Sequence, residues 1–206
     1  MSTDPFARRT FLSRALLGVG ASAVSFDAHA AAGPDDRDVR SFGAKGDGRA
    51  LDTPAINLAI QTAAKAGGGT VRFPAGTYLC YSIHLASKVA LYLDPGSTIF
   101  AADPPLSGAS GGYDDAEPMA FDKFQDFGHS HFHNSLIWGE GLEDVTIFGA
   151  GLIWGKGLSK GYGSERKPEE PHGGNKAISL KNCHNVHIAG FFHPQRRTFW
   201  DSRHGS

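Results

Sequence analysis

The stretch that decides the fold runs from residue 38 to residue 78. It opens with DVRSFGAKGDG at 38–48, continues with DTPAI at 52–56, and closes with GGGTVRFPAGTY at 67–78. The residues from Val39 to Gly48 predict a short strand that runs into a glycine-rich loop, because glycine adopts backbone angles that other residues avoid.

The middle of this stretch predicts one α-helix. Thr53 is a favoured N-cap residue, and Pro54 suits the first helical position. Apolar residues then recur at helical spacing, and the three glycines at 67–69 end the segment. The recurring residues are Ile56, Ala59, Ile60 and Ala63. We expect this helix to cap the first coil of a solenoid, since solenoids need a terminal element with a polar face.

Short β-rich runs follow the helix and are separated by turn residues. They lie at 70–73, 78–81, 83–85, 89–93 and 98–100. The segment 102–133 is irregular and rich in Gly, Asp and Pro, so it predicts a loop excursion from the stack of strands. Long loops on a solenoid often carry its binding surface.

A repeat of 41 residues favours a stack of parallel coils. Leu136-Ile137 and DVTIFG at 144–149 match Ala177-Ile178 and NVHIAG at 185–190. This period lies within the roughly 20–50 residues of solenoid repeats. One copy cannot bury its apolar face alone, so the copies must stack. The alternative is an antiparallel β-sandwich, which this spacing does not specially favour.

The first thirty residues are typical of an export signal and not of a folded domain. Arg8-Arg9 precedes a short apolar run at 15–24, and Ala28-His29-Ala30 offers a small-x-small cleavage pattern. The order resembles a bacterial twin-arginine signal, which implies the export machinery as a partner and a periplasmic or secreted location. The apolar run is shorter than the about 20 residues that span a bilayer. The alternative is a basic N-terminal helix of the domain.

The last residues, 192–206, differ in character from the alternating pattern before them. Three arginines, a proline and a tryptophan replace it. Codons for this segment, read one base later, permit a further β-helix strand, so one hypothesis is a frame slip near Phe191. A natural basic tail is the alternative. We therefore expect residues 31–191 to be the N-terminal part of a β-helix domain.

The composition excludes several classes of function. The chain has 20 Lys and Arg against 21 Asp and Glu, a formal net charge of −1. No field of one sign favours nucleic acid or a membrane surface. Apolar residues make up 40%, and 27 residues are glycine, as in a turn-rich β protein. Cys80 and Cys183 show no disulfide or zinc spacing, so two separate buried thiols are expected and a pair is the alternative.

Together these segments resemble polygalacturonase-type glycoside hydrolases, glycoside hydrolase family 28. The resemblance extends from Asp38 to about Phe191 and is tightest at 89–98, 135–147 and 149–155. The opening block is shared with other pectin-lyase-like proteins, including rhamnogalacturonase-related and phage tailspike proteins. The resemblance implies an all-β fold, a right-handed single-stranded parallel β-helix with an N-terminal capping α-helix. It also implies pectic or related polysaccharide as the substrate.

The same resemblance implies hydrolysis with inversion, in which one carboxylic acid protonates the leaving oxygen and carboxylates activate a water. The family places its aspartates in an Asn-x-Asp motif and an Asp-Asp pair, followed by Gly-His-Gly and Arg-x-Lys. This sequence has no match to that ordered set, and Asp114-Asp115 lies too far upstream. We assign no catalytic, cofactor-binding or metal residue and expect no hydrolytic activity. The alternatives are a calcium-dependent pectate-lyase-like enzyme and a non-catalytic carbohydrate-binding β-helix.

Three groups of residues are weaker candidates for a site. His129, His131 and His133 alternate, so on a strand they would share a face that could bind a metal, although no carboxylate or Cys partner stands at ligand spacing. Aromatic residues offer sugar-stacking faces, but core packing is expected for them. They are Phe148, Trp138, Trp154 and Tyr162. A basic loop suits a uronate polymer or is simply solvated, and it contains Lys156, Lys160, Arg166 and Lys167.

Overall fold

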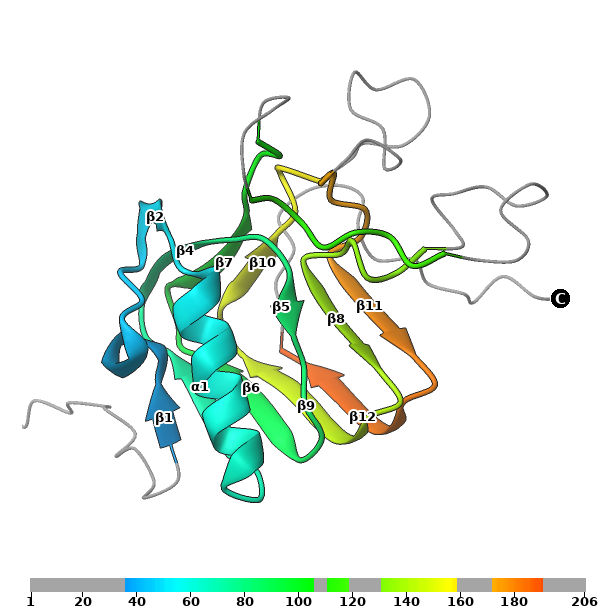
Figure 1. Cartoon of the computed structure of the whole chain (residues 1–206). Coiled ribbons are helices and arrows are strands. Elements are labelled where there is room, and N and C mark those ends of the chain that lie inside the picture. Colours follow the sequence, from blue (N-terminus) through cyan, green and yellow to red (C-terminus); the bar gives the residue numbers. More distant parts are fainter. Residues whose placement is uncertain (1–35, 106–110, 119–130, 159–171, 191–206) are drawn as a thin grey trace, which may run out of the picture. The chain divides into compact units, whose positions relative to one another are not determined.

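The computed structural model describes residues 36–105, 111–118, 131–158 and 172–190 (Figure 1). The predicted export signal at 1–30 and the tail at 192–206 lie outside these residues. Within the described ranges, no helix has the length and apolar character needed to cross a membrane.

The strands form three parallel sheets. The first has the order β1-β3-β6-β9-β12, with β1 (Asp36–Asp38), β3 (Gly69–Phe73), β6 (Val89–Leu93), β9 (Glu143–Gly149) and β12 (His184–Ala189). The second has the order β10-β7-β4-β2, with β2 (Asp47–Leu51), β4 (Gly76–Cys80), β7 (Ser97–Ala101) and β10 (Leu152–Trp154). The third has the order β11-β8-β5, with β5 (Ile83–His84), β8 (Ile137–Glu140) and β11 (Ile178–Lys181).

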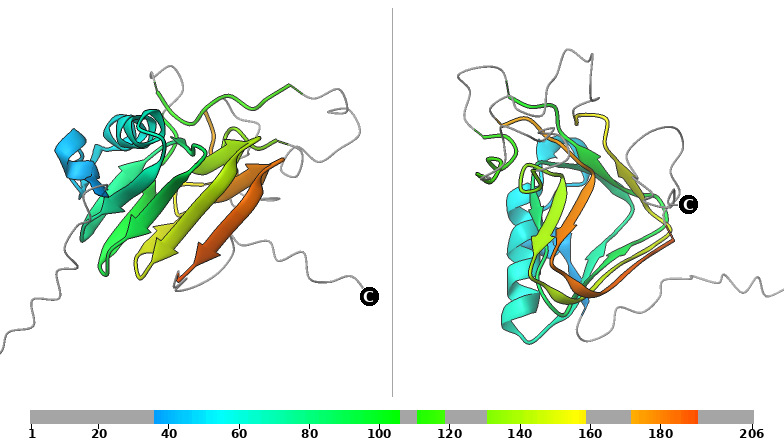
Figure 2. Two further views of the ribbon diagram at one scale, coloured as in Figure 1. Left: turned by 90° about the horizontal axis from the view of Figure 1, so that it is seen from below. Right: turned by 90° about the vertical axis from the view of Figure 1, so that its right-hand side faces the viewer.

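The chain visits the three sheets in turn, so each complete coil adds one strand to each sheet. In Figure 2 the right-hand view shows the sheets as the sides of one coil, and the left-hand view shows successive strands side by side. Every pair of neighbouring strands is parallel. The predicted right-handed parallel β-helix with one N-terminal α-helix is confirmed, and the antiparallel sandwich is excluded.

The core consists of inward side chains stacked in register from coil to coil. Leu91 pairs with Ile147, which pairs with Ile188. The second sheet stacks Tyr78, Ile99 and Ile153, and the third stacks Ile83, Ile137 and Ile178. Because Ile178 pairs with Ile137 and Ile188 with Ile147, the predicted period of 41 residues is confirmed as the register between coils.

The Asx residues of the repeat also stack. Asp144 and Asn185, near the starts of β9 and β12, both adopt left-handed backbone angles, with φ of 57° and 51°. The Asn185 side-chain nitrogen donates to Asp144 Oδ1 at 2.6 Å. Asn and Asp tolerate this conformation better than most residues, which explains their place at the turn.

The α-helix α1 (Thr53–Lys65) buries the predicted apolar residues, Ile56, Ala59, Ile60 and Ala63. Its predicted N-cap is wrong by one residue, because Asp52 is the N-cap and makes no side-chain cap bond. The buried Asp52 carboxylate accepts from the backbone nitrogens of Lys45 and Gly46. The Thr53 hydroxyl accepts instead from the backbone nitrogen of Tyr81.

The segment 39–48 also differs from its prediction. Val39–Phe42 forms a short 3₁₀ helix, η1, and not a strand. The strand begins later, with β2 at Asp47. Asp38 accepts from the backbone nitrogen of Arg40, and such local side-chain bonds at a helix start compete with extended structure.

In the first coil α1 stands where the third sheet would have a strand, between β2 and β3 along the chain and against β5 (Figure 1). The Asn57 side chain pairs with the edge of β5 as a strand would. Its nitrogen donates to the Ser82 carbonyl oxygen at 3.0 Å, and its oxygen accepts from the His84 backbone nitrogen at 2.9 Å. The helix therefore satisfies an edge that would otherwise pair with another chain.

We expect Asn57→Ala to lower the free energy of unfolding by about 2 kcal/mol, because it leaves a backbone donor and acceptor unpaired. The neighbouring side chain of Leu58 is 50% exposed, so Leu58→Ala should cost less than about 0.5 kcal/mol. Urea unfolding of the two variants measures this difference. Equal losses would show that Asn57 does not satisfy the edge.

We expect Gly149→Ala to destabilise far more than Gly141→Ala. Both glycines have positive φ, at 123° and 66°. A Cβ on Gly149 would overlap the Leu93 carbonyl oxygen of the coil below, whereas one on Gly141 meets nothing within 4 Å. Gly141→Ala should cost about 1 kcal/mol from its backbone angle alone. Similar unfolding midpoints in urea for the two variants would contradict close stacking at Gly149.

Candidate functional site

Polar side chains gather on the outer face of the third sheet. Register places His84 beside Trp138 and Trp138 beside Ser179, one from each strand. Two residues further along, Glu140 pairs with Lys181. We define the β5–β8–β11 face as the partly exposed side chains of these rows together with two that reach it from nearby loop segments, Asp114 and His133. Ser179 is only 4% exposed and lies beneath this face.

Asp114 joins the first two strands of this face. Its Oδ2 lies 2.6 Å from His84 Nε2 and accepts from Trp138 Nε1 at 2.8 Å. The Asp114 backbone nitrogen donates to Ser82 Oγ at 3.0 Å, and that hydroxyl donates to the Ser135 carbonyl oxygen. The carboxylate therefore has a fixed place above β5 and β8, held by both side chain and backbone.

The pKa of Asp114 is lowered from its ordinary value. Partial burial raises it, but the hydrogen bonds from His84 and Trp138 stabilise the charged form more strongly. Asp114 is therefore ionised at neutral pH. Because an ionised carboxylate only accepts hydrogen bonds, the proton between the two side chains lies on His84 Nε2.

A second His–carboxylate pair stands beside the first. The His133 ring stacks on Trp138, with centroids 4.1 Å apart and planes 25° apart. His133 Nε2 lies 3.0 Å from Glu140 Oε2, and Lys181 Nζ lies 3.1 Å from Glu140 Oε1. The hydrogen bonds from His133 and Lys181 lower the pKa of Glu140. Trp138 thus lies between the two rings, in an edge-to-face contact with His84 and stacked on His133.

The segment that carries His133 is anchored from behind by Glu117. The Glu117 carboxylate accepts from the backbone nitrogens of Phe132 and His133, each at 3.0 Å. Partial burial raises the pKa of Glu117, but these backbone bonds lower it below its ordinary value. Lys176 Nζ donates to the His131 carbonyl oxygen and lies over the Phe132 ring. These contacts therefore hold Phe132 and His133 in place next to the β5–β8–β11 face.

The carboxylates at this face differ from a general acid in the direction of their pKa shifts. A general acid for glycosidic cleavage needs a raised pKa, whereas the pKa values of Asp114, Glu117 and Glu140 are all lowered. Among the described residues, no group of three or more His, Cys, Asp or Glu side chains is placed to hold a metal ion. The described side chains can accept and donate hydrogen bonds to a ligand, and none of these three carboxylates has the raised pKa of a general acid.

Of the three histidines considered as a metal face, the two that the structure describes do not share a face. His131 is buried and His133 stacks on Trp138, in a turn and not a strand, so strand alternation does not apply. His129 lies outside the described residues, as do Tyr162, Lys160, Arg166 and Lys167. Lys156 is exposed and lies 5.5 Å from the centre of the Trp154 ring.

Core packing was the wrong prediction for the described aromatic residues. Trp138, Phe148 and Trp154 take outward positions, because strand alternation gives the inward ones to their neighbours. Phe148 packs on Tyr92 of the coil below with centroids 4.8 Å apart, and Trp154 packs on Phe100 at 4.9 Å. These stacks lie on the other two sheets, away from the β5–β8–β11 face.

The two cysteines are not joined. Cys80 is a free buried thiol, and Cys183 is free and partly exposed. Burial raises the pKa of the Cys80 thiol. Separate thiols were predicted correctly, but only Cys80 is fully buried.

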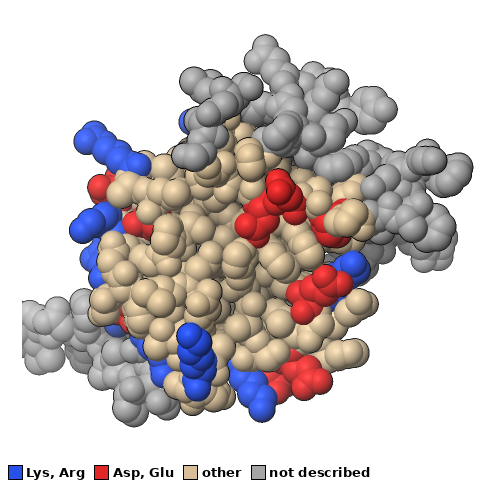
Figure 3. Space-filling view, in the orientation of Figure 1, with Lys and Arg blue, Asp and Glu red and all other residues tan. Residues whose placement is uncertain are grey.

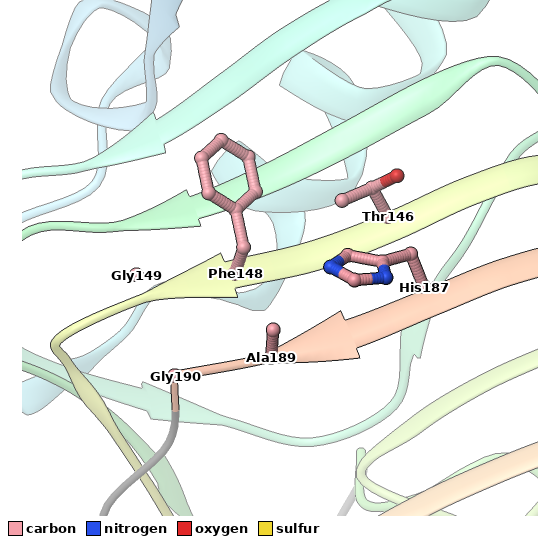
Figure 4. A pocket seen from close by; sticks show the side chains of 6 residues that line it. All are labelled: Thr146, Phe148, Gly149, His187, Ala189 and Gly190. Carbon is pink, nitrogen blue, oxygen red and sulfur yellow. The ribbon is translucent and has the colours of Figure 1, made fainter.

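A hollow of about 450 Å³ lies on the outer side of β9 and β12 (Figure 4). The Thr146, Phe148 and His187 side chains stand along it, and Gly149, Ala189 and Gly190 complete its lining. It holds no carboxylate, and the aromatic ring in it already packs on Tyr92. The hollow is therefore a weaker candidate than the β5–β8–β11 face.

Sequence reasoning assigned no residue to a site and so missed this face. One signal was present, because Glu140 and Lys181 are one repeat apart and must be neighbours if the coils stack. No such signal linked His84 with Trp138, since the long excursion between them breaks the period. Asp114 comes from that excursion, and nothing local in the sequence indicates where it folds back.

Comparison with known proteins supports the fold. Residues 37–128 match the family model described as rhamnogalacturonase A/epimerase, pectate lyase-like. An exopolygalacturonase of family 28 from Yersinia enterocolitica superposes with a TM-score of 0.56 and 23% identity, over 77% of this chain and 34% of that one. The resemblance in fold to polygalacturonases and other pectin-lyase-like β-helices, predicted from the sequence, is confirmed.

Two further proteins are similar over parts of the chain. A putative glycosyl hydrolase from Parabacteroides merdae superposes with a TM-score of 0.54 and 25% identity, over 76% of this chain and 63% of that one. Alginate lyase 7 of Azotobacter vinelandii is 48% identical over 64 residues, which are 31% of this chain and 8% of the relative. The chain thus matches less than a tenth of that curated relative's length.

We expect Trp138→Phe to raise the pKa of Asp114 toward its ordinary value, because the ring remains but the indole donor is lost. A lowered folded-state pKa adds stability above the unfolded-state pKa, and that stability is lost as pH falls through the folded-state value. The variant should therefore be less stable than the parent at pH 7, and this deficit should shrink toward pH 3.

Urea unfolding at both pH values and a carboxyl NMR titration measure these effects. Trp154→Phe is the matched control, because Trp154 is 45% exposed and its stability cost should not vary with pH. A deficit of Trp138→Phe that is the same at pH 7 and pH 3 would contradict the assigned hydrogen bond.

Proposed function

We propose that residues 31–191 are the N-terminal part of a polygalacturonase-like glycoside hydrolase that acts on pectic or related polysaccharide. The observation that carries this proposal is the β5–β8–β11 face. It lines up partly exposed hydrogen-bonding side chains along the coil axis, as an extended polymer requires. Side chains of His84, Asp114, Glu140 and Lys181 are between 35% and 43% exposed.

The comparisons agree with a polysaccharide ligand. The structures superposed above are an exopolygalacturonase and a putative glycosyl hydrolase, and the curated relative is an alginate lyase. We further propose that the paired arginines at 8–9 direct the chain to the twin-arginine export machinery and so to the periplasm or the outside of the cell.

We also propose that this chain binds polysaccharide without hydrolysing it. The sequence lacks the ordered set of aspartates that the resemblance associates with hydrolysis. The shifted carboxylates on the face are ionised at neutral pH and cannot protonate a leaving group. A calcium-dependent lyase is less well supported, since it needs carboxylates clustered around an ion and the described residues show no such group.

Affinity electrophoresis in gels that contain pectin tests the binding. We expect the full chain to be retarded and Trp138→Ala to weaken binding about tenfold, which is about 1.4 kcal/mol. Tyr92→Ala is the control, because Tyr92 is also an outward aromatic residue but lies on the first sheet. Equal weakening by both variants, or no retardation of the parent, would contradict a polysaccharide site on the β5–β8–β11 face.

Reducing-end release from polygalacturonate tests the proposed lack of hydrolysis. We expect none above background, with an active polygalacturonase as the positive control. Release by the purified chain that follows the protein through a second chromatographic step would overturn this part of the proposal.

A further inference from the structure

Asp114 presents an open hydrogen-bond acceptor on this face. His84 and Trp138 both bind Oδ2, and Oδ1 has no partner among the described residues. The Nε2 atoms of His84 and His133 are engaged by the carboxylates of Asp114 and Glu140. Because an ionised carboxylate only accepts hydrogen bonds, a ligand at Asp114 Oδ1 must bring a donor.

Cationic groups on the face are few and already engaged. Lys181 pairs with Glu140, and Lys176 binds the His131 carbonyl oxygen. The arginines within the described ranges lie elsewhere, on β1, η1, β2 and β3. In Figure 3 acidic side chains gather on the half of the molecule that carries β8 and β11, and most Lys and Arg side chains lie toward the opposite and lower edges.

On the face itself Asp114 and Glu140 are acidic, Glu117 lies behind it, and the side chain of Asp115, next to Asp114, is 88% exposed. A free uronate here would meet carboxylates more often than unpaired cations.

We propose that the sugar units bound over His84, Asp114 and His133 carry no charge, so that this part of the face selects neutral or methyl-esterified sugars over free uronates. The inference rests on the proposed polysaccharide site and narrows its ligand. Sugar hydroxyl groups donate to Asp114 Oδ1. A uronate carboxylate has no hydrogen to donate, and like charges brought together at an interface oppose binding.

Two polymers that differ only in charge provide the test. Highly methyl-esterified galacturonan and the same preparation after saponification share a backbone, and a neutral galactan serves as a third probe. Affinity electrophoresis at pH 8 compares the three polymers. We expect the full chain to bind the esterified polymer about tenfold more tightly than the saponified one, a ratio that corresponds to about 1.4 kcal/mol.

Asp114→Asn is the decisive variant. Asparagine keeps the size of the side chain, removes its charge and can present an amide donor. We expect the preference for the esterified polymer to fall at least severalfold. Asp94→Asn is the control, because Asp94 pairs with Arg72 on the first sheet. Circular dichroism of both variants checks that each remains folded.

Each outcome has a distinct meaning. Equal or tighter binding of the saponified polymer by the parent overturns the inference and leaves the polysaccharide site standing. An unchanged preference in Asp114→Asn also overturns it, since Asp114 would not be the discriminating group. Failure to bind any of the three polymers overturns the proposed function itself, and the inference with it.

Discussion

In-register pairing of parallel strands is the constraint on which the rest of this structure depends. A coil of the β-helix buries its apolar side chains only against the same positions of the next coil, so a slip of one residue would turn every inward side chain outward. The inward isoleucines of the third sheet, Ile83, Ile137 and Ile178, show this dependence. Close contacts such as that of Gly149 with the Leu93 carbonyl group then fix the spacing between coils.

The same register builds the candidate site. Alternation along a strand sends every second residue outward, so an inward column of isoleucines is accompanied by an outward row. On the third sheet that row contains His84, Trp138 and Ser179, and the next contains Glu140 and Lys181. Stacking that stabilises the core thus aligns polar groups along the coil axis, and an extended polymer can follow that line.

In the first coil a helix covers the strand edge that would otherwise be unpaired. α1 replaces a strand of the third sheet, and Asn57 supplies the donor and acceptor that a strand would have offered to β5. The hydrogen bonds of Asn57 also help to position the candidate site, because one of them is made with the backbone nitrogen of His84. Among the described residues of the last coil, Val186 is 37% exposed although its partner Val145 is buried.

The sequence alone was sufficient to predict the repeating coil of the β-helix. Periodicity, turn residues and the repeat predicted α1, β3, β6 and the register of β11 on β8, because these depend on neighbours in the chain or on a constant period. The sequence did not predict contacts between side chains and distant partners. The Asp52 carboxylate binds the backbone nitrogens of residues 45 and 46, and the N-cap of α1 was predicted one residue too late. The sequence also failed at the site, since Asp114 reaches His84 and Trp138 from an excursion with no period. Only the folded chain brings those groups together, because their proximity arises from the path of a loop and not from any local preference.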